Sequence, residues 1–471
     1  MTSINLINGG LDVLGIVDNL IAVERLPIDR LETRVENYQK KISAYQALNS
    51  KLLAFKTSIE SLLFQGEDVP LNMPSAYADR LSKSLFALRT TASSNEDAVT
   101  ATAGKGAAIG NYSVAVSQLA KFHSFASNNF LSDTDTLTKT GTLVIQKAGE
   151  AAVTITIDET NNNLQGIKSA INSQNAGFTA TIMNDGSGTP YRLVITSDDS
   201  GTANALTITN NLTQGADGDV TLLETTAAQD AELEINGVSI TSSSNTVADA
   251  IEGITFELKA ESGTASVRVE RDDDAIVAGL KDFVSKYNDV VSYVTSQSRY
   301  DATQKTAGIL AGDFAMRAAH TDLASILSQS LSISGNSFRV LSQAGITLAN
   351  NGTLSLDESL LRNKLSSNFD DLAHLFLADG LNGVGATTSM MPAIQDRLKS
   401  LTDTIDGPVF HASGALQQNI SRLNLQIEQM ESRLEMRREV LITQYSKADA
   451  ALRQLSVLQA SLEGLVSSLK S

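Results

Sequence analysis

The 471-residue sequence has no cysteine, no tryptophan and few aromatic residues, and it carries many more acidic than basic side chains. Without cysteine, the chain can form no disulfide bond, thiol nucleophile or thiolate-ligated metal site. Aromatic residues make up only 5% of the chain, so the composition gives no sign of a large aromatic-lined pocket. The formal net charge of −17 argues against binding to nucleic acid or to an anionic membrane, since both attract basic surfaces.

Long apolar runs are absent as well. No stretch of about 18 apolar residues occurs, and the first six residues contain neither a basic cluster nor an apolar core. We therefore expect no membrane-spanning helix and no cleavable secretory signal. If the protein leaves the cell, it uses a route that needs neither. The lack of cysteine suits export of an unfolded chain through a narrow channel, and a cytosolic home explains it equally well.

The residue types that usually act in catalysis or in metal and phosphate binding form no recognisable motif. The four histidines, listed below, are far apart, and no two are four residues apart as in a helical zinc motif. Gly104-Lys105-Gly106 lacks the spacing of a phosphate-binding loop. We expect no catalytic residue, no cofactor and no metal site, and we interpret as surface or packing residues His123, His320, His374 and His411.

The C-terminal stretch has a long heptad pattern. Of fifteen positions spaced alternately three and four apart, thirteen are apolar and two, Arg437 and Gln444, are not. Such a pattern predicts a supercoiling helix roughly 80 Å long. We interpret Arg437 and Gln444 as residues that fix the helix register; the alternative is a contact with another subunit. The apolar positions are Ile420, Leu423, Ile427, Met430, Leu434, Leu441, Ala448, Ala451, Leu455, Leu458, Leu462, Leu465 and Leu469.

The N-terminal stretch has a similar pattern. The heptad slips by three residues after Tyr45 and then continues to residue 62, and Pro27 marks the expected start of the helix. Upstream, residues 11–21 suggest a short separate amphipathic piece. Neither terminal helix can bury its stripe alone, so the stripes form a candidate self-assembly seam; the alternative is a hairpin within one monomer. The seam residues before the slip are Ile28, Leu31, Val35, Tyr38, Ile42 and Tyr45.

The middle of the chain is rich in β-strand signals. Residues 153–157, 178–183, 191–196 and 205–209 alternate at period two, and apolar residues between 164 and 171 follow a helical period. Asn236-Gly237 separates two alternating runs, which predicts a type I′ hairpin. Further strands are expected at residues 254–258 and 265–269. Residues 131–227 have four basic against eleven acidic residues, a local net charge of −7, which is typical of a solvated outer domain.

Helical patterns return after residue 272. Asp272-Asp273-Asp274 precedes an apolar stripe over residues 276–291, and we interpret these acids as a helix cap rather than a metal site. Further helices are expected at residues 314–328 and 359–376.

The predicted fold class is an α+β multidomain protein in which coiled-coil-like terminal helices and a helical leg domain enclose nested β-rich head domains. We expect a terminal helical region at 1–70 and 411–471, a helical leg domain at 71–105 and 271–410, a β-rich head domain at 106–130 and 228–270, and an inserted outer head domain at 131–227.

Several segments, in order along nearly the whole chain, are similar to the flagellar hook-associated protein 2 family. The N-terminal segment contains Gly10-Leu11-Asp12 and Glu24-Arg25-Leu26-Pro27-Ile28. A later segment reads Asn245-Thr246-Val247-Ala248-Asp249-Ala250-Ile251. Tyr445 stands where we would expect Phe. The other segments that carry the resemblance are 110–120, 310–313, 341–357 and 444–452.

The resemblance implies a structural cap at the tip of the bacterial flagellar filament and not an enzyme. Members of this family assemble as rings, commonly of five identical subunits, whose legs reach flagellin while exported flagellin folds beneath the head plate. The resemblance also implies neighbouring hook–filament junction proteins, a chaperone at the C-terminal region and secretion through the flagellar type III apparatus. Partners are therefore expected to be proteins, with no nucleic acid and no membrane insertion.

Two other interpretations remain open from the sequence. A flagellin or a junction protein would share helical ends around a variable middle, although the Glu24 to Pro27 segment and the 245–251 segment favour the cap. An adhesin would use the acidic head to bind host glycans, and a protein at the filament tip is well placed for cell adhesion. An adhesin alone, however, would not need two long heptad helices.

Overall fold

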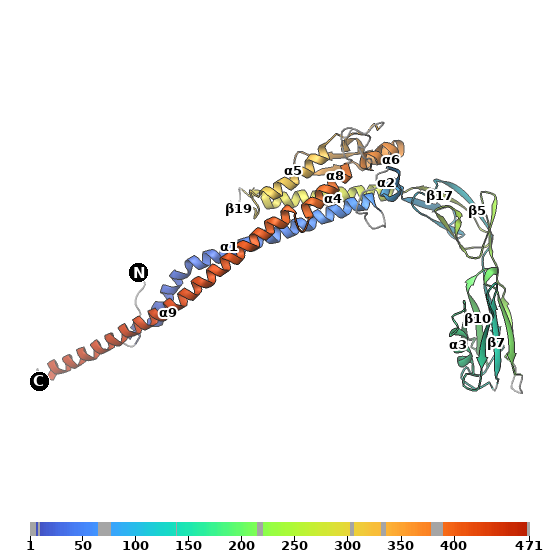
Figure 1. Ribbon diagram of the computed structural model, residues 1–471, viewed down its shortest axis with the longest axis horizontal. Helices are drawn as coiled ribbons and strands as arrows, with labels where there is room; N and C mark the ends of the chain where they lie inside the picture. The colour runs from blue at the N-terminus through green and yellow to red at the C-terminus, as the bar shows by residue number, and fades with distance from the viewer. Residues whose placement is uncertain are drawn as a thin grey trace. The chain divides into compact units, whose positions relative to one another are not determined.

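The structure is a computed structural model that describes residues 6–7, 10–64, 77–137, 139–213, 220–301, 306–330, 336–377 and 390–468. The chain divides into two compact units, one formed by residues 1–80 and 277–471 and the other by residues 81–276. The first unit is mostly helical and the second mostly β-sheet (Figure 1). The predicted α+β multidomain fold class is confirmed.

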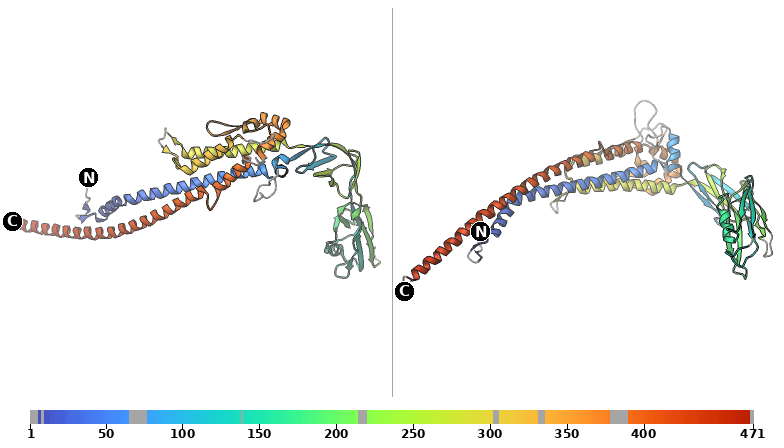
Figure 2. Two further views of the ribbon diagram at one scale, coloured as in Figure 1. Left: turned by 45° about the horizontal axis from the view of Figure 1, so that its top comes forward. Right: turned by 60° about the horizontal axis from the view of Figure 1, so that its bottom comes forward.

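The helical unit is built around two long antiparallel helices. Helix α1 spans Val13–Leu63 and helix α9 spans Pro408–Ser468. The two run side by side in every view, and α9 continues past the first residues of α1 (Figures 1 and 2). The remaining helices of this unit are α4 (Asp273–Ser298, whose first turn belongs to the other unit), α5 (Phe314–Ser328), α6 (Glu358–Ser367), α7 (Phe369–Leu377) and α8 (Met390–Thr402).

The core of the helical unit lies at the C-terminal half of α1. Phe55 of α1 is fully buried against the rings of Phe283 and Tyr287 from α4, with ring centroids 5.4 and 5.7 Å apart. The hydroxyl of Tyr45 donates a hydrogen bond to Asp313, whose other carboxylate oxygen accepts from the Met316 amide at the start of α5. The described residues of this unit also form three short hairpins, namely β1–β2 (Leu6–Ile7, Gly10–Leu11), β18–β19 (Tyr300–Asp301, Thr306–Ala307) and β20–β21 (Ile346–Leu348, Leu354–Leu356).

Two details of the helical prediction were wrong. Helix α1 begins at Val13, capped by the Asp12 carboxylate, so Pro27 lies inside the helix and residues 11–21 are not a separate piece. Proline costs an interior helix about 3 kcal/mol, and burial of Val17 and Ile28 on either side offsets that cost. The helix expected at 359–376 is two helices, α6 and α7, broken at Asn368, whose φ of −142° and ψ of 45° lie outside the helical range.

The β unit contains two clusters of antiparallel strands, each with its own core. In the first β-sandwich, a sheet of order β14-β13-β5-β17-β3 shares an apolar core with a sheet of order β15-β16-β4. The unit also contains the short helix α2 (Tyr77–Lys83), which begins in the helical unit. The strands are β3 (Arg89–Ser93), β4 (Val99–Ala103), β5 (Gly110–Gln118), β13 (Ala231–Ile235), β14 (Val238–Ser242), β15 (Thr246–Ile251), β16 (Ile254–Leu258) and β17 (Thr264–Arg271).

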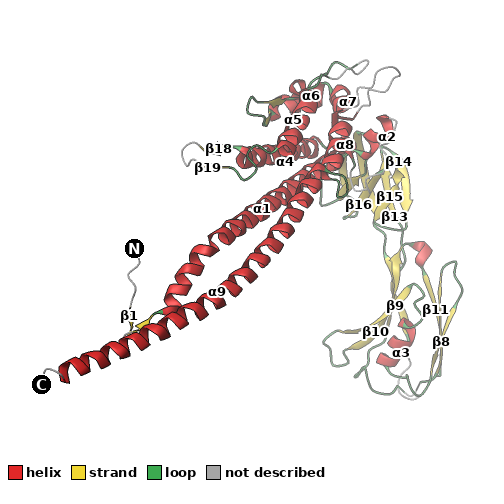
Figure 3. Cartoon of the chain, turned by 60° about the vertical axis from the view of Figure 1, so that its left-hand side comes forward, coloured by secondary structure: helices red, strands yellow, loops and turns green. Residues whose placement is uncertain are grey.

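The second β-sandwich is inserted between β5 and β13 of the first. A sheet of order β12-β6-β10-β9 and a sheet of order β11-β7-β8 enclose a common core, and α3 (Leu164–Asn172) packs against β8, β9 and β10 (Figure 3). Leu164, Ile167 and Ile171 of α3 are fully buried in this core. The strands are β6 (Phe122–Ser127), β7 (Gly141–Lys147), β8 (Val153–Ile157), β9 (Phe178–Asn184), β10 (Tyr191–Ser200), β11 (Leu206–Leu212) and β12 (Leu222–Thr226).

The predicted local signals in the β unit are confirmed. Asn236 and Gly237 connect β13 to β14 with φ of 51° and 80°, the two positive values that a type I′ turn requires. Asp272 caps α4, because its carboxylate accepts a hydrogen bond of 2.8 Å from the amide of Ala275.

Candidate functional site

The candidate site is the α1–α9 hairpin, and its seam has the same heptad spacing on both helices. On α1 the inward stripe reads Val17, Ile21, Glu24, Ile28 and Leu31, at spacings of four, three, four and three. Val17 and Ile28 are fully buried, and Ile21 and Leu31 are half-buried. On α9 the facing stripe is the predicted one, from residue 420 to residue 441. This packing gives the two helices the stability that neither would have alone.

Charged residues interrupt both stripes, and they meet. The guanidinium of Arg437 on α9 lies 3.6 Å from the carboxylate of Glu24 on α1. One residue along α1, Arg25 contacts Glu431 of α9 at 3.5 Å, so the polarity of this second pair is reversed. Further toward the start of α1, Asp18 accepts a hydrogen bond of 3.1 Å from Arg438. A slip of one heptad would separate all three pairs, so they favour the interpretation of Arg437 as a residue that fixes the register.

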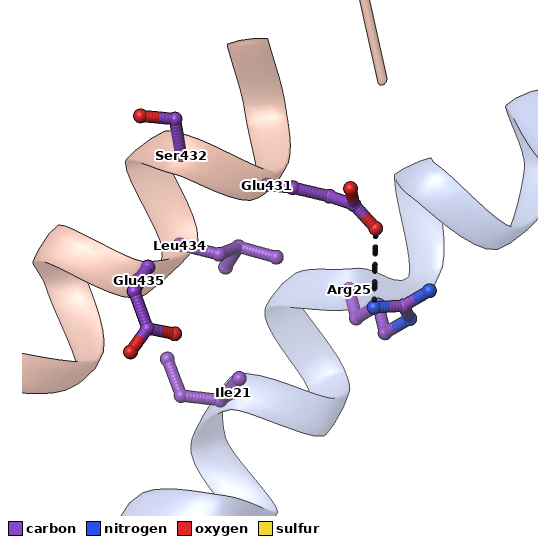
Figure 4. Close-up of a pocket in the computed structure, with 6 residues that line it drawn as sticks. All are labelled: Ile21, Arg25, Glu431, Ser432, Leu434 and Glu435. Carbon is purple, nitrogen blue, oxygen red and sulfur yellow. Dashed lines mark ion pairs between the residues drawn. The ribbon is translucent and has the colours of Figure 1, made fainter. Parts of the chain in front are cut away.

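Leu434 lies at the centre of this charged section. It points from α9 toward Ile21 of α1, and the ion pair between Arg25 and Glu431 spans the helices beside it (Figure 4). The helices leave a shallow hollow on each side of Leu434, one lined by Ile21 and Arg25 and the other by Glu24 and Arg437. The seam is therefore thin here, with one half-buried leucine between pairs of partly solvated charges.

Beyond Leu441, α9 has an apolar stripe that its own chain leaves exposed. Leu455, Leu458, Leu462 and Leu465 continue the heptad, and all four are exposed, between 57% and 62%. Leu452 and Val466 flank this stripe and are also exposed. We call residues 448–468 the tail of α9. A single exposed leucine needs no explanation, but a continuous stripe of them on one helix marks an interaction surface.

The structure divides the predicted seam into three groups. Buried seam residues are Ile28, Tyr45, Ile420, Leu423 and Leu441; half-buried ones are Leu31, Val35, Tyr38, Ile42, Ile427, Met430 and Leu434; exposed ones are Leu455, Leu458, Leu462 and Leu465. Leu469 lies outside the described residues. The buried group contacts its own chain, and Tyr45 in particular is held by Asp313. The exposed group is the part of the seam that is accessible to another molecule.

Sequence reasoning missed Glu24 as a member of the seam. A charged residue breaks the apolar pattern of a heptad, so Glu24 was not assigned to the seam. Pro27 was also interpreted as the start of the helix, which lies after Glu24. The available signal was the spacing of Val17, Ile21, Glu24 and Ile28, together with the opposite charge of Arg437 at the one charged position of the other stripe.

The histidines take packing or surface positions. His123 is buried in the second β-sandwich, where its Nδ1 accepts a hydrogen bond of 2.7 Å from the amide of Leu206. His374 stacks on Tyr77 at 3.7 Å, and its burial lowers its pKa, although the nearby Asp370 and Asp371 oppose this shift. His411 is exposed on α9, and the side chain of His320 lies outside the described residues.

Two findings limit the chemistry of the described residues. Nowhere among them do three side chains of His, Cys, Asp or Glu come together in a way that could hold a metal ion. Of the helices in the described part of the chain, none combines the length and the apolar character needed to cross a membrane.

Comparison with known proteins gives matches along the whole chain. Residues 9–123 match the family model described as the N-terminus of flagellar hook-associated protein 2, and residues 228–456 match the model of its C-terminus. The A-type flagellar hook-associated protein 2 of Pseudomonas aeruginosa is 30% identical over 99% of this chain and 98% of its own length. The flagellar hook-associated protein 2 of Escherichia coli K12 is 29% identical over 95% of this chain and 96% of its own.

Solved structures give the same result. The crystal structure of the flagellar cap protein FliD D1-D2-D3 domains from Escherichia coli is 31% identical and has a TM-score of 0.61. The similarity covers 79% of this chain and 99% of that one.

Proposed function

Because the chain belongs to the flagellar hook-associated protein 2 family, we propose that it forms the structural cap at the distal end of the bacterial flagellar filament. There it retains exported flagellin subunits and promotes their folding and insertion. The family consists of structural flagellar proteins, so the role is mechanical and not catalytic. The protein acts outside the cell, at the filament tip.

The observation that best supports this role is the exposed stripe on the tail of α9. A long helix that exposes a row of leucines is unstable as a lone monomer in water, and it becomes stable when it packs on a partner. A cap subunit needs such a surface, since it must hold its neighbours and the filament while flagellin enters. The buried half of the seam, from residue 420 to residue 441, gives the leg its stiffness.

We further infer that copies of the chain assemble as a ring of five, with the helical units as legs and the β-sandwiches as the plate. The legs contact flagellin, and hook–filament junction proteins are further partners in the same structure. The chain travels through the flagellar type III apparatus, and an export chaperone shields the C-terminal region on the way. A chaperone is required because the tail leucines would otherwise be exposed in the cytoplasm.

Removal of the gene from the bacterium that encodes this chain tests the role. Cells without it should release flagellin monomers into the medium and carry no filaments, and the full-length chain should restore the filaments. Leu455→Lys should fail to restore them, whereas Val457→Lys should succeed, because Leu455 is on the tail stripe and the equally exposed Val457 is on the opposite side of α9. Normal filaments in the deleted strain would refute the proposal.

A further inference from the structure

Helix α1 has a second apolar stripe, separate from the one that packs on α9. Ile16, Leu20, Val23 and Leu26 follow one another at spacings of four, three and three, so they share one side of the helix. Leu20, Val23 and Leu26 are exposed, at 38%, 64% and 51%, and Ile16 is half-buried. We call these four residues the outer stripe of α1. Val17 and Ile28 of the inward stripe are fully buried, whereas Val23 and Leu26 are more than half exposed, so these two lie outside the α1–α9 seam and Leu20 lies at its edge.

The tail of α9 also has an apolar stripe that is left exposed. Its exposed residues Leu455, Leu458, Leu462 and Leu465 lie on one side, whereas Val457, at 68% exposed, lies on the other. Helix α9 carries no proline after its first residue and is continuous to Ser468. The tail therefore cannot fold back onto the outer stripe of its own α1, because α9 would have to break. About 20 residues extend roughly 30 Å beyond the last paired turn.

The charge distribution favours a second copy of this chain as the occupant. The chain carries a net charge of −17, so most surfaces of two copies repel each other. The tail has three described charges, Asp449, Arg453 and Glu463, and Arg453 is paired with Asp449 at 2.8 Å. Beside the outer stripe, Asp18, Glu24 and Arg25 are all paired with α9. The charges beside the outer stripe are therefore compensated by α9, and the tail keeps a net charge of only −1, so repulsion between these two surfaces is weak.

We propose that the α9 tail of one copy packs on the outer stripe of α1 in a second copy. The inference rests on the proposed ring and names the surfaces that join its legs. The two stripes are different, so the contact is heterologous and each copy gives one stripe and receives the other. Such contacts produce closed rings when the rotation between copies is suitable. A standard protein interface buries about 800 Å² of surface on each partner, and a short helix pair buries less than that. A single contact is therefore weak, and closure of the ring strengthens the assembly because each copy then makes two such contacts.

Cross-linking tests the pairing directly, because the natural chain has no cysteine. Full-length Val23→Cys is mixed with size-tagged full-length Leu458→Cys, with Leu455→Cys or Leu462→Cys as replacements one turn away, and the mixture is oxidised. The expected result is a disulfide heterodimer of tagged and untagged chains, since a disulfide forms only where the Cα atoms come within about 4–7 Å. The control, Val457→Cys in place of Leu458→Cys, should give none. Homodimers of Leu458→Cys alone would overturn the pairing, since the tails would then pack on each other.

Sizing of charge variants gives a second, independent readout. Val23→Glu and Leu458→Glu should each lower the affinity between copies at least about tenfold, whereas Val457→Glu should leave it unchanged. All three sites are exposed, so circular dichroism should show an unaltered fold. Loss of rings with Leu458→Glu but not with Val23→Glu would overturn the pairing and place another surface or another protein on the tail.

The two proposals fail in different ways. If the wild-type chain forms rings that neither Val23→Glu nor Leu458→Glu disturbs and no heterodimer appears, the pairing is wrong and the cap stands. If filaments grow normally without the protein but the heterodimer forms, the cap is wrong and the pairing stands.

Discussion

The carboxylate of Glu24 on α1 lies 3.6 Å from the guanidinium of Arg437 on α9, at the point where each apolar stripe has its charged residue. The two charges are half-exposed, so their attraction is worth no more than about 1 kcal/mol. Their main effect is on alignment, because any other register would place one of them against an apolar side chain without a partner.

A double-mutant cycle at this pair tests the alignment. Arg437→Glu should destabilise the hairpin, because it sets a second carboxylate against that of Glu24, and Glu24→Arg should do the same with two guanidinium groups. The double variant Glu24→Arg with Arg437→Glu should recover most of the loss, with a coupling energy of about 0.5–1 kcal/mol. Urea unfolding followed by circular dichroism measures each change. Additive losses in the double variant would mean that the two residues do not interact.

Leu434 should be the most sensitive residue in the charged section. Leu434→Glu removes the apolar contact with Ile21 and adds a third carboxylate beside Glu431 and Glu435. We expect a loss of about 2–4 kcal/mol in the stability of the hairpin, while the β-sandwiches remain folded because they have separate cores. Exchange of amide hydrogens, read by mass spectrometry, should rise in α1 and α9 only. Protection lost equally in the β-strands would contradict the separation of the two units.

Two tyrosines of the helical core should respond oppositely to loss of the hydroxyl. Tyr45→Phe removes the hydrogen bond to Asp313 and should destabilise the protein by about 1–3 kcal/mol. The hydroxyl of Tyr287 is buried and has no hydrogen-bond partner in the described part of the chain. Tyr287→Phe should therefore be neutral or stabilising by about 1 kcal/mol. Thermal unfolding of the two variants compares them, and equal destabilisation would show that Tyr287 has a partner.

Alkaline pH should destabilise the helical unit. Burial raises the pKa of Tyr287 to about 12. The pKa of Tyr45 is also raised, mainly by burial and further by the hydrogen bond to Asp313 and its charge. The folded protein then holds these protons more tightly than the unfolded chain, so stability is complete below about pH 10 and falls as pH rises toward about 12. Phenolate absorbance should show late-titrating tyrosines that ionise together with loss of helix; uniform titration at the ordinary pKa would contradict their burial.

Two glycines of the second β-sandwich provide a matched pair of backbone probes. Gly201 and Gly186 both have positive φ, of 93° and 74°. A Cβ on Gly201 would lie 2.6 Å from Ser243, whereas one on Gly186 would meet nothing within 4 Å. Gly186→Ala should lower the stability of the protein by about 1 kcal/mol, because alanine disfavours a positive φ. Gly201→Ala should lower it clearly more, because Ser243 must also move to make room for the new Cβ. Equal melting temperatures for the two variants would show that Ser243 can move away from the new Cβ without loss of stability.

Much of the fold could be predicted from the sequence because its patterns are local. Asn236-Gly237 specifies its own turn, and Leu164, Ile167 and Ile171 specify the buried side of α3 whatever surrounds it. Pro27 was misread because its cost is local but the compensation, burial of Val17 and Ile28 against α9, comes from a segment far away in the sequence.

The candidate site was less accessible to sequence reasoning. The heptad predicts that Leu441 and Leu458 share a stripe, and they do, but it cannot tell which of them the chain covers itself. That depends on where α1 starts, since the α1–α9 pairing ends where α1 does. The partner of Arg437 and the outer stripe of α1 likewise emerge only when the two helices are placed side by side.

The mass and shape of the full-length protein in solution test the central claim most directly. Light scattering combined with negative-stain electron microscopy should reveal rings of several subunits, with legs that protrude from a plate. A compact particle of one chain at every concentration would contradict the proposed cap, because the tail leucines would then have no partner in another copy.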